Sequence, residues 1–217
     1  MDKTVEAFKK ISIAAVSDAL DKLGINGTCL GIGPINYGYQ MVGRAFTVKY
    51  LPVAIDKGTV GDYIDEVTPG SVVVLDNAGR LDATVWGDIL TSVAHMKGIA
   101  GTVIHGVCRD VKCSLDLKYP IFSRGKFMRT GKDRVDAVAY NVPVSLGENV
   151  QVRPGDILYG SDDGVLVIHQ EREDEILAVA QMIEEKEEGI RKEIMNGTPL
   201  KEAREKFGYH HLQTREK

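Results

Sequence analysis

The sequence predicts an α/β fold with a sheet-rich core and a helical extension at the C-terminus. Three patterns support this prediction. Strand-like apolar runs alternate with helix-like segments between residues 71 and 122, which is typical of parallel α/β units. Residues 134–169 then contain several short strand-like runs separated by Gly and Pro turns. Residues 171–195 follow with one long, charged helical pattern.

Length and composition indicate one soluble domain spanning residues 1–217. The formal net charge is −4 and no long basic block occurs, so nucleic acid is not an expected partner. No apolar run reaches the length of a membrane span, and the first residues lack a signal-peptide core, so we expect no membrane partner. The cysteines are few and odd in number, which favours a reducing cytoplasm over a disulfide framework.

The first predicted element is a helix over residues 5–23, because apolar side chains recur there at nearly helical spacing and Gly24 ends the run. The following elements are predicted from apolar periodicity and from Gly and Pro punctuation. In chain order they are a strand at 41–50, a short helical end at 63–67, a strand at 71–76, a helix at 87–96, a strand at 101–104, a helix at 111–117 and a strand at 119–122.

The C-terminal helices are predicted over residues 171–207, with a break at Asn196-Gly197. The longer helix carries a narrow apolar stripe made by Ile176, Ala180, Ile183, Ile190 and Ile194. Glu187 falls on that stripe, where a carboxylate is unexpected. Such a stripe packs either on a neighbouring subunit or on its own domain, and the sequence favours neither alternative.

The segment from Gly87 to Leu90 is the first candidate binding element. If a helix begins there, its first N–H groups have no intrahelical partners and favour an anion such as a carboxylate. Gly87 would let a ligand approach the backbone closely. Asp88 also has a purely structural explanation, since acidic residues are common in the first turn of a helix.

Arg109 and Asp110 form the second candidate, directly after a predicted strand and a glycine turn. Ligands of α/β sheets bind at the carboxyl ends of strands. Arg109 could bind a carboxylate through two N–H groups and neutralise a developing enolate. Asp110 could hold Mg²⁺ or Mn²⁺, which prefer oxygen ligands. Alternatively, Arg109 is a surface residue and Asp110 caps the next helix. His105, just before this segment, is either an acid–base group or a structural residue.

The two candidate segments together are a more specific signal than either segment alone, because a spacing of twenty residues separates Asp88 from the Arg109-Asp110 pair. With this spacing the chain resembles the class II pyruvate aldolases, typified by 4-hydroxy-4-methyl-2-oxoglutarate aldolase, and the related regulator of ribonuclease activity A proteins. The resemblance spans nearly the whole chain. Further matching segments are Val16–Leu20, Gly43–Ala45 with Thr47-Val48, Gly106–Asp110, Pro154–Asp156 and Asp162–Val165.

The resemblance implies a swivelling β/β/α-type domain and a metal-dependent lyase that releases pyruvate from a 4-hydroxy-2-keto acid. It implies that Asp110 ligates the Mg²⁺ or Mn²⁺ ion and that Asp88 holds the ion through water. Arg109 and the backbone of Gly87, Asp88, Ile89 and Leu90 would grip the keto acid. Oxaloacetate decarboxylation passes through the same enolate and would be a second activity.

The resemblance also implies a homotrimer or hexamer in which a neighbouring subunit supplies an acid to each site. Glu187 is our candidate for that acid. One departure concerns Cys113, because some members carry an acid at this position and then often a Gly at the position of Asp88. This chain keeps the acid at Asp88, and we expect Cys113 to be a small buried residue. The alternative function is a non-catalytic regulator that binds a ribonuclease or helicase.

Overall fold

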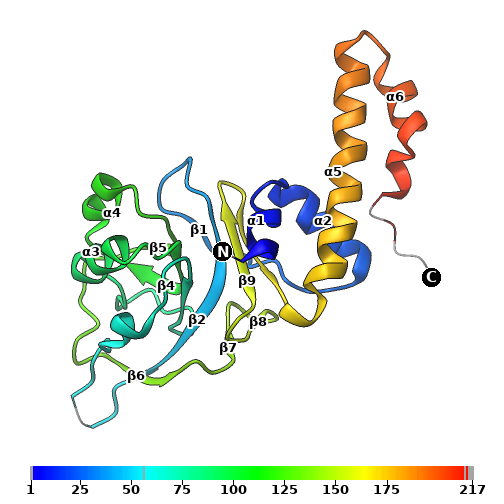
Figure 1. Ribbon diagram of the computed structural model, residues 1–217. Coiled ribbons are helices and arrows are strands. Elements are labelled where there is room, and N and C mark those ends of the chain that lie inside the picture. Colours follow the sequence, from blue (N-terminus) through cyan, green and yellow to red (C-terminus); the bar gives the residue numbers. More distant parts are fainter. Residues whose placement is uncertain (1, 56, 213, 215–217) are drawn as a thin grey trace. The chain divides into compact units, whose positions relative to one another are not determined.

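The computed structural model describes residues 2–55, 57–212 and 214, and contacts divide the chain into two compact units (Figure 1). The helical unit comprises residues 1–27 and 171–217, and the sheet unit comprises residues 28–170. The mixed α/β fold that the sequence predicts is confirmed. The prediction that residues 1–217 form a single domain stays a prediction. None of the helices built from described residues is both long and apolar enough to cross a membrane.

The sheet unit is organised around one large mixed sheet with the strand order β1-β5-β4-β3-β2-β9-β10, to which β6 adds by pairing with β2. The strands β2 to β5 lie parallel to one another, as the alternating pattern predicts. An isolated bridge between Thr28 and Leu166 connects the segment before β1 to β10, so the sheet is nearly closed. The strands are β1 Gly33–Pro34, β2 Met41–Pro52, β3 Val72–Asp76, β4 Gly101–Cys108, β5 Ile121–Lys126, β6 Val135–Tyr140, β7 Val144–Ser145, β8 Gln151–Val152, β9 Ile157–Ser161 and β10 Gly164–Ile168.

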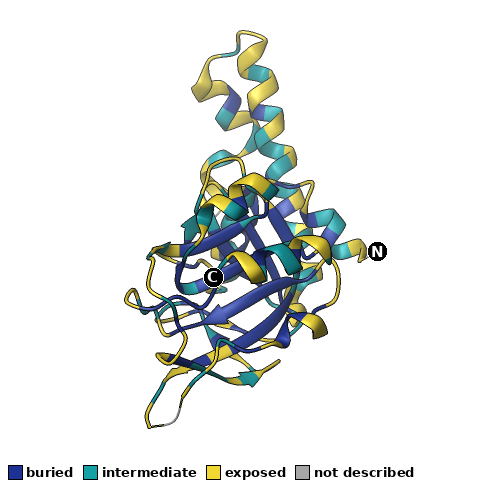
Figure 2. Ribbon diagram, turned by 90° about the vertical axis from the view of Figure 1, so that its left-hand side faces the viewer, coloured by how far each residue is buried: buried dark blue, intermediate teal, exposed yellow. Residues whose placement is uncertain are grey.

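The central strand β3 is buried on both faces, as Figure 2 shows for the strands of this unit. Successive side chains point to opposite faces of a sheet. Val73 and Leu75 accordingly join an apolar cluster with the helices α3 (Asp88–Met96) and α4 (Val111–Leu117) and the η1 turn (Tyr63–Glu66). Val72 and Val74 join a second cluster with β9, β10 and the β7–β8 hairpin. This two-sided burial explains why the strand reads as an unbroken apolar run.

Among its described residues the sheet unit has three short helical elements. The 3₁₀ turn η1 spans Tyr63–Glu66, α3 spans Asp88–Met96 and α4 spans Val111–Leu117. The positions predicted for α3 and α4 are confirmed. The strand β4 is longer than its prediction, because it continues through Gly106 to Cys108, with an irregular register against β5 at that point.

The helical unit contains α1 Lys3–Phe8, α2 Ile13–Leu23, the η2 turn Gln170–Arg172 at its edge, α5 Glu173–Met195, α6 Leu200–Phe207 and the η3 turn Tyr209–His211. The single helix expected over residues 5–23 is wrong. Ser12 interrupts it, because its side chain caps α2 by accepting the N–H of Ala15 at 3.2 Å. Gly24 ends α2 in the left-handed conformation, as predicted.

The apolar stripe of α5 packs within its own unit. Its first four members are buried and α5 contacts α2, whereas Ile194 remains 41% exposed. The break after α5 lies where Asn196-Gly197 predicts it, and Gly197 takes a positive φ of 92°. The stripe therefore has a partner inside the chain, and packing of α5 on another subunit stays untested.

Candidate active site

Two loops of the sheet unit meet at the carboxyl end of its parallel strands. The segment after β3 lies parallel to the end of β4 through a bridge between Thr84 and Val107, and it leads into α3 at Gly87. The segment after β4 is only Arg109-Asp110 before α4 begins. The N–H of Arg109 donates to the carbonyl of Trp86 at 3.0 Å, which fixes the two segments side by side.

The structure brings Asp88, Arg109 and Asp110 together as the sequence spacing suggests. The N–H of Asp88 lies 3.4 Å from Oδ2 of Asp110, and Nε of Arg109 lies 3.3 Å from the same oxygen. Gly87 permits this approach, since a Cβ there would lie 2.8 Å from that carboxylate oxygen. The Asp110 side chain remains 40% exposed and accessible to a ligand.

The backbone conformation at Asp110 restricts which residue types can occupy this position. Asp110 is the N-cap of α4 and takes φ 55° and ψ 37°, in the left-handed region. Asp and Asn occupy this region more readily than other residues with a side chain. Its carboxylate makes no capping bond to α4 and faces Asp88 and Arg109 instead, so the capping explanation for Asp110 does not fit.

A pocket of about 120 Å³ opens beside these residues. Gly87, Asp88, Ile89, Leu90 and Arg109 line it. Further lining residues come from Val60, from the segment Thr84–Trp86 and from the loop Thr130–Lys132. Within this lining Asp88 is the acid, and Arg109 and Lys132 are the cations.

Sequence reasoning missed the contribution of the loop Thr130–Lys132. No motif marks Lys132, and its place depends on how the loop packs. Gly131 is buried and a Cβ there would lie 2.1 Å from the carbonyl oxygen of Thr84, so only glycine lets the loop approach so closely. A glycine flanked by polar residues was the one signal available.

Asp88 and Asp110 can hold a hard cation only if water or substrate occupies most of the ion's coordination positions. The described residues contain no group of three or more His, Cys, Asp and Glu side chains arranged to hold a metal ion. Mg²⁺, however, usually keeps several waters and uses one or two carboxylates together with the substrate. The oxygen donors of Asp110 and Asp88 fit such an open site and do not form a closed cage.

Two cysteines lie close to the site without a chemical role in it. Cys113 is partly exposed, contrary to the buried position expected, because its Sγ lies at the surface contact between α3 and α4, 3.6 Å from Ser92 Oγ. Cys108 precedes Arg109, and burial raises the pKa of its thiol despite the opposing hydrogen bond with Ser123. A neutral buried thiol is a poor nucleophile.

His105 belongs to a separate polar cluster. Its Nδ1 lies 3.4 Å from Asp76 Oδ1 and 3.1 Å from the carbonyl oxygen of Ser145. The other oxygen of Asp76 accepts the N–H of Ser145 at 3.2 Å. These contacts connect the end of β3 to β7 and support the structural explanation of His105.

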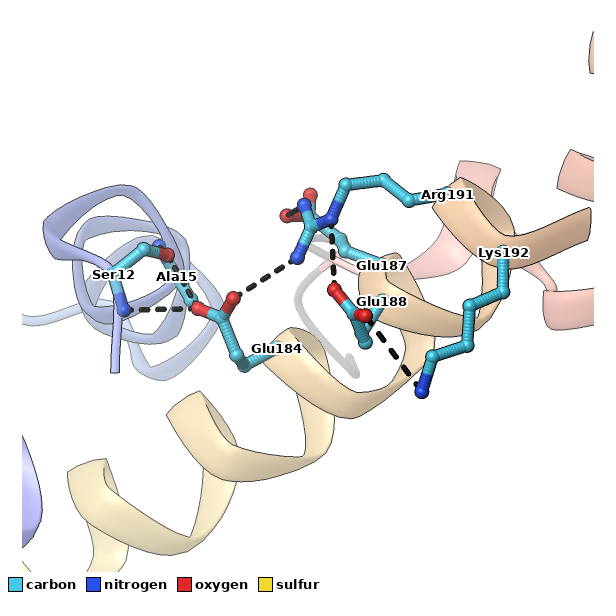
Figure 3. A network of polar contacts seen from close by, with 7 residues as sticks. All are labelled: Ser12, Ala15, Glu184, Glu187, Glu188, Arg191 and Lys192. Atoms are coloured by element: carbon cyan, nitrogen blue, oxygen red, sulfur yellow. Dashed lines mark hydrogen bonds and ion pairs between the residues drawn. The ribbon is translucent and has the colours of Figure 1, made fainter. Parts of the chain in front are cut away.

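Glu187 lies on α5 in the helical unit (Figure 3). Its Oε2 is 3.5 Å from Nη1 of Arg191, whose guanidinium also contacts Glu184 and Glu188. The carboxylate therefore has a partner within its own chain, although the side chain remains 23% exposed.

Comparison with known proteins identifies the family. A family model described as "RraA-like: Aldolase/RraA" matches residues 13–167. The chain belongs to this RraA-like family. The match includes Gly87–Leu90 and Arg109-Asp110, and covers β1 to β9 and most of β10.

Two relatives illustrate the range of the RraA-like family. "Protein DlpA" of Legionella pneumophila is 42% identical over 213 residues, which are 96% of this chain but 34% of DlpA, so the chain spans about a third of that protein. A Halalkalibacterium halodurans protein named "Putative 4-hydroxy-4-methyl-2-oxoglutarate aldolase" is 36% identical over 177 residues, covering 82% of this chain and 81% of the relative.

Two solved structures share the fold. An uncharacterized protein from Pseudomonas syringae pv. tomato has a TM-score of 0.87 at 40% identity and covers 93% of this chain and 96% of its own. RraAS2 of Streptomyces coelicolor, described as an unusual member of the RNase ES inhibitor RraA protein family, has a TM-score of 0.79 at 29% identity and covers 88% of this chain and 96% of its own.

Proposed function

We propose that the chain is a divalent-metal-dependent lyase that cleaves a 4-hydroxy-2-keto acid, of the 4-hydroxy-4-methyl-2-oxoglutarate type, to pyruvate. The observation that carries the proposal is the approach of Asp88, Arg109 and Asp110 around one carboxylate oxygen beside a pocket. The aldolase name of a relative that aligns over most of both chains supports the same reaction class.

The pocket offers two attachment points for a dicarboxylic keto acid. The first turn of α3 and the guanidinium of Arg109 would hold the 2-keto carboxylate end, with the N–H of Ile89 exchanging its 2.9 Å bond to Asp88 Oδ1 for one to the substrate. Lys132 lies in the same lining and would attract a second carboxylate at the distal end of the substrate.

Asp110, with Asp88 through water, would hold Mg²⁺ or Mn²⁺. The bound ion would supply a Lewis acid for the keto group of the substrate. Arg109 would neutralise the same region of the substrate, because it lines the pocket and its Nε lies 3.3 Å from Oδ2 of Asp110.

The cleavage moves one proton and three electron pairs. The distal hydroxyl loses its proton and its O–H electron pair forms the carbonyl of the C4 product. The bond between C3 and C4 breaks, its electron pair forms the C2–C3 double bond, and the keto π pair moves to the C2 oxygen, which gives the enolate of pyruvate. Asp88, directly or through a water, is the acid in the pocket lining that can accept the proton. Arg109 stabilises the enolate oxygen, and protonation of C3 by water completes pyruvate.

The same site accounts for a second activity, oxaloacetate decarboxylation. Loss of CO₂ from C4 of oxaloacetate leaves the electron pair on C3 and produces the same pyruvate enolate. A pocket that stabilises this enolate through Arg109 would therefore accelerate both reactions.

We propose a homotrimer or hexamer in which Glu187 of a neighbouring subunit completes each site. Glu187 would have to leave its contact with Arg191, which costs little for a partly exposed pair. Mixing inactive Arg109→Ala subunits with Glu187→Gln subunits tests this idea. Partial recovery of activity would support a shared site, and no recovery would remove Glu187 from the proposal.

A second candidate function is regulation of a ribonuclease or helicase by binding. The likeness to RraAS2, described as a member of an RNase inhibitor family, favours it. A regulator needs no carboxylate at the positions of Asp88 and Asp110, so the two functions respond differently to substitutions there.

The deciding experiment is an assay of the purified protein with 4-hydroxy-4-methyl-2-oxoglutarate and with oxaloacetate. Pyruvate is followed with Mg²⁺ or Mn²⁺ and again after EDTA. Turnover that EDTA abolishes and added metal restores is expected. No metal-dependent turnover of either substrate would contradict the lyase and leave the regulator.

A further inference from the structure

Trp86, the one tryptophan of the chain, contacts both halves of the candidate site. Its carbonyl oxygen accepts the N–H of Arg109 at 3.0 Å. Its indole Nε1 donates to Oγ1 of Thr91, in the first turns of α3, at 2.8 Å. One buried residue, only 2% exposed, therefore contacts the Arg109 segment through its main chain and the helix after Gly87 through its indole.

The Thr91 hydroxyl connects the Trp86 indole to the Gly87 carbonyl. Because Thr91 Oγ1 accepts the indole N–H, its own proton is available for an acceptor, and the carbonyl of Gly87 lies 2.8 Å away. The same carbonyl also accepts the backbone N–H of Thr91 at 3.0 Å. Gly87 has no side chain that could cap α3, so these two bonds fix the orientation of its peptide.

The indole is held in place on its other side. The Trp86 ring stacks on Tyr119, with centroids 6.2 Å apart and an interplanar angle of 7°. The Tyr119 hydroxyl in turn lies 2.9 Å from Oγ1 of Thr102 on β4. All four side chains are buried. Buried, satisfied networks of this kind hold a single conformation, because breaking any member leaves an unpaired polar atom.

We propose that Trp86 and Thr91 are positioning residues of the candidate site. They hold the Gly87 peptide, and with it the first-turn N–H groups of α3, at a fixed separation from Arg109 and Asp110. This inference rests on the proposed lyase function. Neither residue touches the reacting atoms, so their effect on the reaction passes through the main chain of Gly87–Leu90.

The competing explanation is that Thr91 only stabilises its helix. Threonine hydroxyls often donate to the carbonyl four residues earlier in a helix without any role in a ligand site. Both explanations predict a lower melting temperature when the hydroxyl is removed. Only the positioning explanation predicts slower turnover in protein that is fully folded at the assay temperature.

The test compares Thr91→Val, which removes the hydroxyl, with Thr91→Ser, which keeps it, and with Trp86→Phe, which keeps a stacking ring and loses the N–H. Thr47→Val is the matched control, since it removes a buried threonine hydroxyl bond, to the carbonyl of Val142, that is no part of the Trp86 network. The steady-state rates of oxaloacetate decarboxylation with Mg²⁺, the melting temperatures and the amide hydrogen exchange over residues 87–96 are measured.

We expect Thr91→Val and Trp86→Phe to lower kcat/KM about tenfold, since small displacements of binding groups are costly. Exchange at residues 87–90 should rise in the same variants without substrate. Thr91→Ser should recover activity to within about twofold, and Thr47→Val should lose melting temperature alone.

Wild-type kcat/KM and unchanged exchange in folded Thr91→Val would overturn the inference, as would an equal loss of turnover in Thr47→Val. The positioning role of Thr91 and the lyase function are tested separately. If the wild-type protein turns over no keto acid and Thr91→Val still raises exchange at residues 87–90, the lyase proposal is wrong while the control of Gly87 by Thr91 stands.

Discussion

The amide nitrogen of Asp88 lies 3.4 Å from the carboxylate of Asp110, although 22 positions separate them in the chain. The first turn of α3 thus faces the acid that begins α4. Asp88 alone has an ordinary structural explanation as an acid in the first turn of a helix, whereas the Asp110 side chain makes no capping bond to α4. Because the N–H of Asp88 and Nε of Arg109 lie at the same Asp110 oxygen, the site combines carboxylates with a cation.

Asp110→Asn should abolish metal-dependent turnover while leaving the fold intact. Asn tolerates the left-handed backbone at this position, whereas Ala would add strain of about 1 kcal/mol and confuse the result. Turnover is measured over a Mg²⁺ titration, with Asp116→Asn on the exposed face of α4 as the control. A variant that kept wild-type activity and metal dependence would show that Asp110 holds no ion.

Arg109→Ala should lower kcat by about 10²–10³, the typical cost of removing a donor that stabilises an oxyanion. Its main-chain bond to Trp86 survives the substitution, so the loop should keep its place. Arg124→Ala is a suitable control, because that guanidinium donates to Gly79 on a different part of the unit. Equal kcat in Arg109→Ala and wild type would remove Arg109 from the reaction.

Gly87→Ala should reduce activity without unfolding the protein. Gly87 has φ −146°, which any residue can adopt, so the effect is steric: the added Cβ would lie 2.8 Å from Asp110 Oδ2 and 3.4 Å from Arg109 Nε. Gly33→Ala, where a Cβ meets nothing within 4 Å, serves as the control. We expect a fall in kcat/KM in Gly87→Ala only, and an unchanged value there would contradict the close approach.

Asp76 should contribute stability that depends on pH. Burial raises its pKa, but hydrogen bonds from His105 and from the N–H groups of Ala78 and Ser145 outweigh this, so its pKa lies below the ordinary value. A carboxylate with a depressed folded pKa stabilises the protein above its unfolded pKa, about 3.9, and loses this contribution as pH falls through the folded pKa.

Asp76→Asn should therefore lower the melting temperature at pH 7 and flatten its decline below pH 4. Melting is followed from pH 2.5 to pH 7. Asp82→Asn is the comparison, since the Asp82 ion pair with Arg80 is exposed and such pairs contribute about 0–1 kcal/mol. Identical pH profiles for Asp76→Asn and wild type would show that the Asp76 cluster does not couple to folding.

Ser12→Ala should destabilise the helical unit by about 1–2 kcal/mol, because it removes the N-cap of α2. It also removes a 2.5 Å bond to Glu184 Oε2 (Figure 3). A cycle with Glu184→Gln separates the two contributions. Additive losses of unfolding free energy in Ser12→Ala and Glu184→Gln would contradict a direct bond between these side chains.

The sequence predicted the elements of this fold better than their boundaries. Local periodicity was sufficient for α3, α4 and α5, since each carries its own apolar face. The division of the first helix at Ser12 comes from its local N-cap bond with the N–H of Ala15, which apolar periodicity does not record. The extension of β4 through Gly106 depends on the irregular pairing with β5.

The residues of the site that a sequence spacing marks were predictable, and the residues that reach the site only through tertiary packing were not. Asp88 and Arg109-Asp110 follow two neighbouring strands, so topology alone brings them together. Lys132 reaches the pocket because Gly131 packs on Thr84, and Trp86 and Thr91 interact through a hydrogen bond that the apolar pattern conceals. Cys113 was expected to be buried, but the edge of α4 leaves it partly exposed.

Formation of the pyruvate enolate is the central claim, and hydrogen exchange at the methyl group of pyruvate tests it most directly. Pyruvate is incubated in D₂O with the protein and Mg²⁺, and its methyl proton signal is followed by NMR. We predict exchange well above the uncatalysed rate in the wild-type protein, which EDTA stops and Arg109→Ala lacks. Exchange at the uncatalysed rate, in a folded protein that contains Mg²⁺, would contradict the proposed lyase.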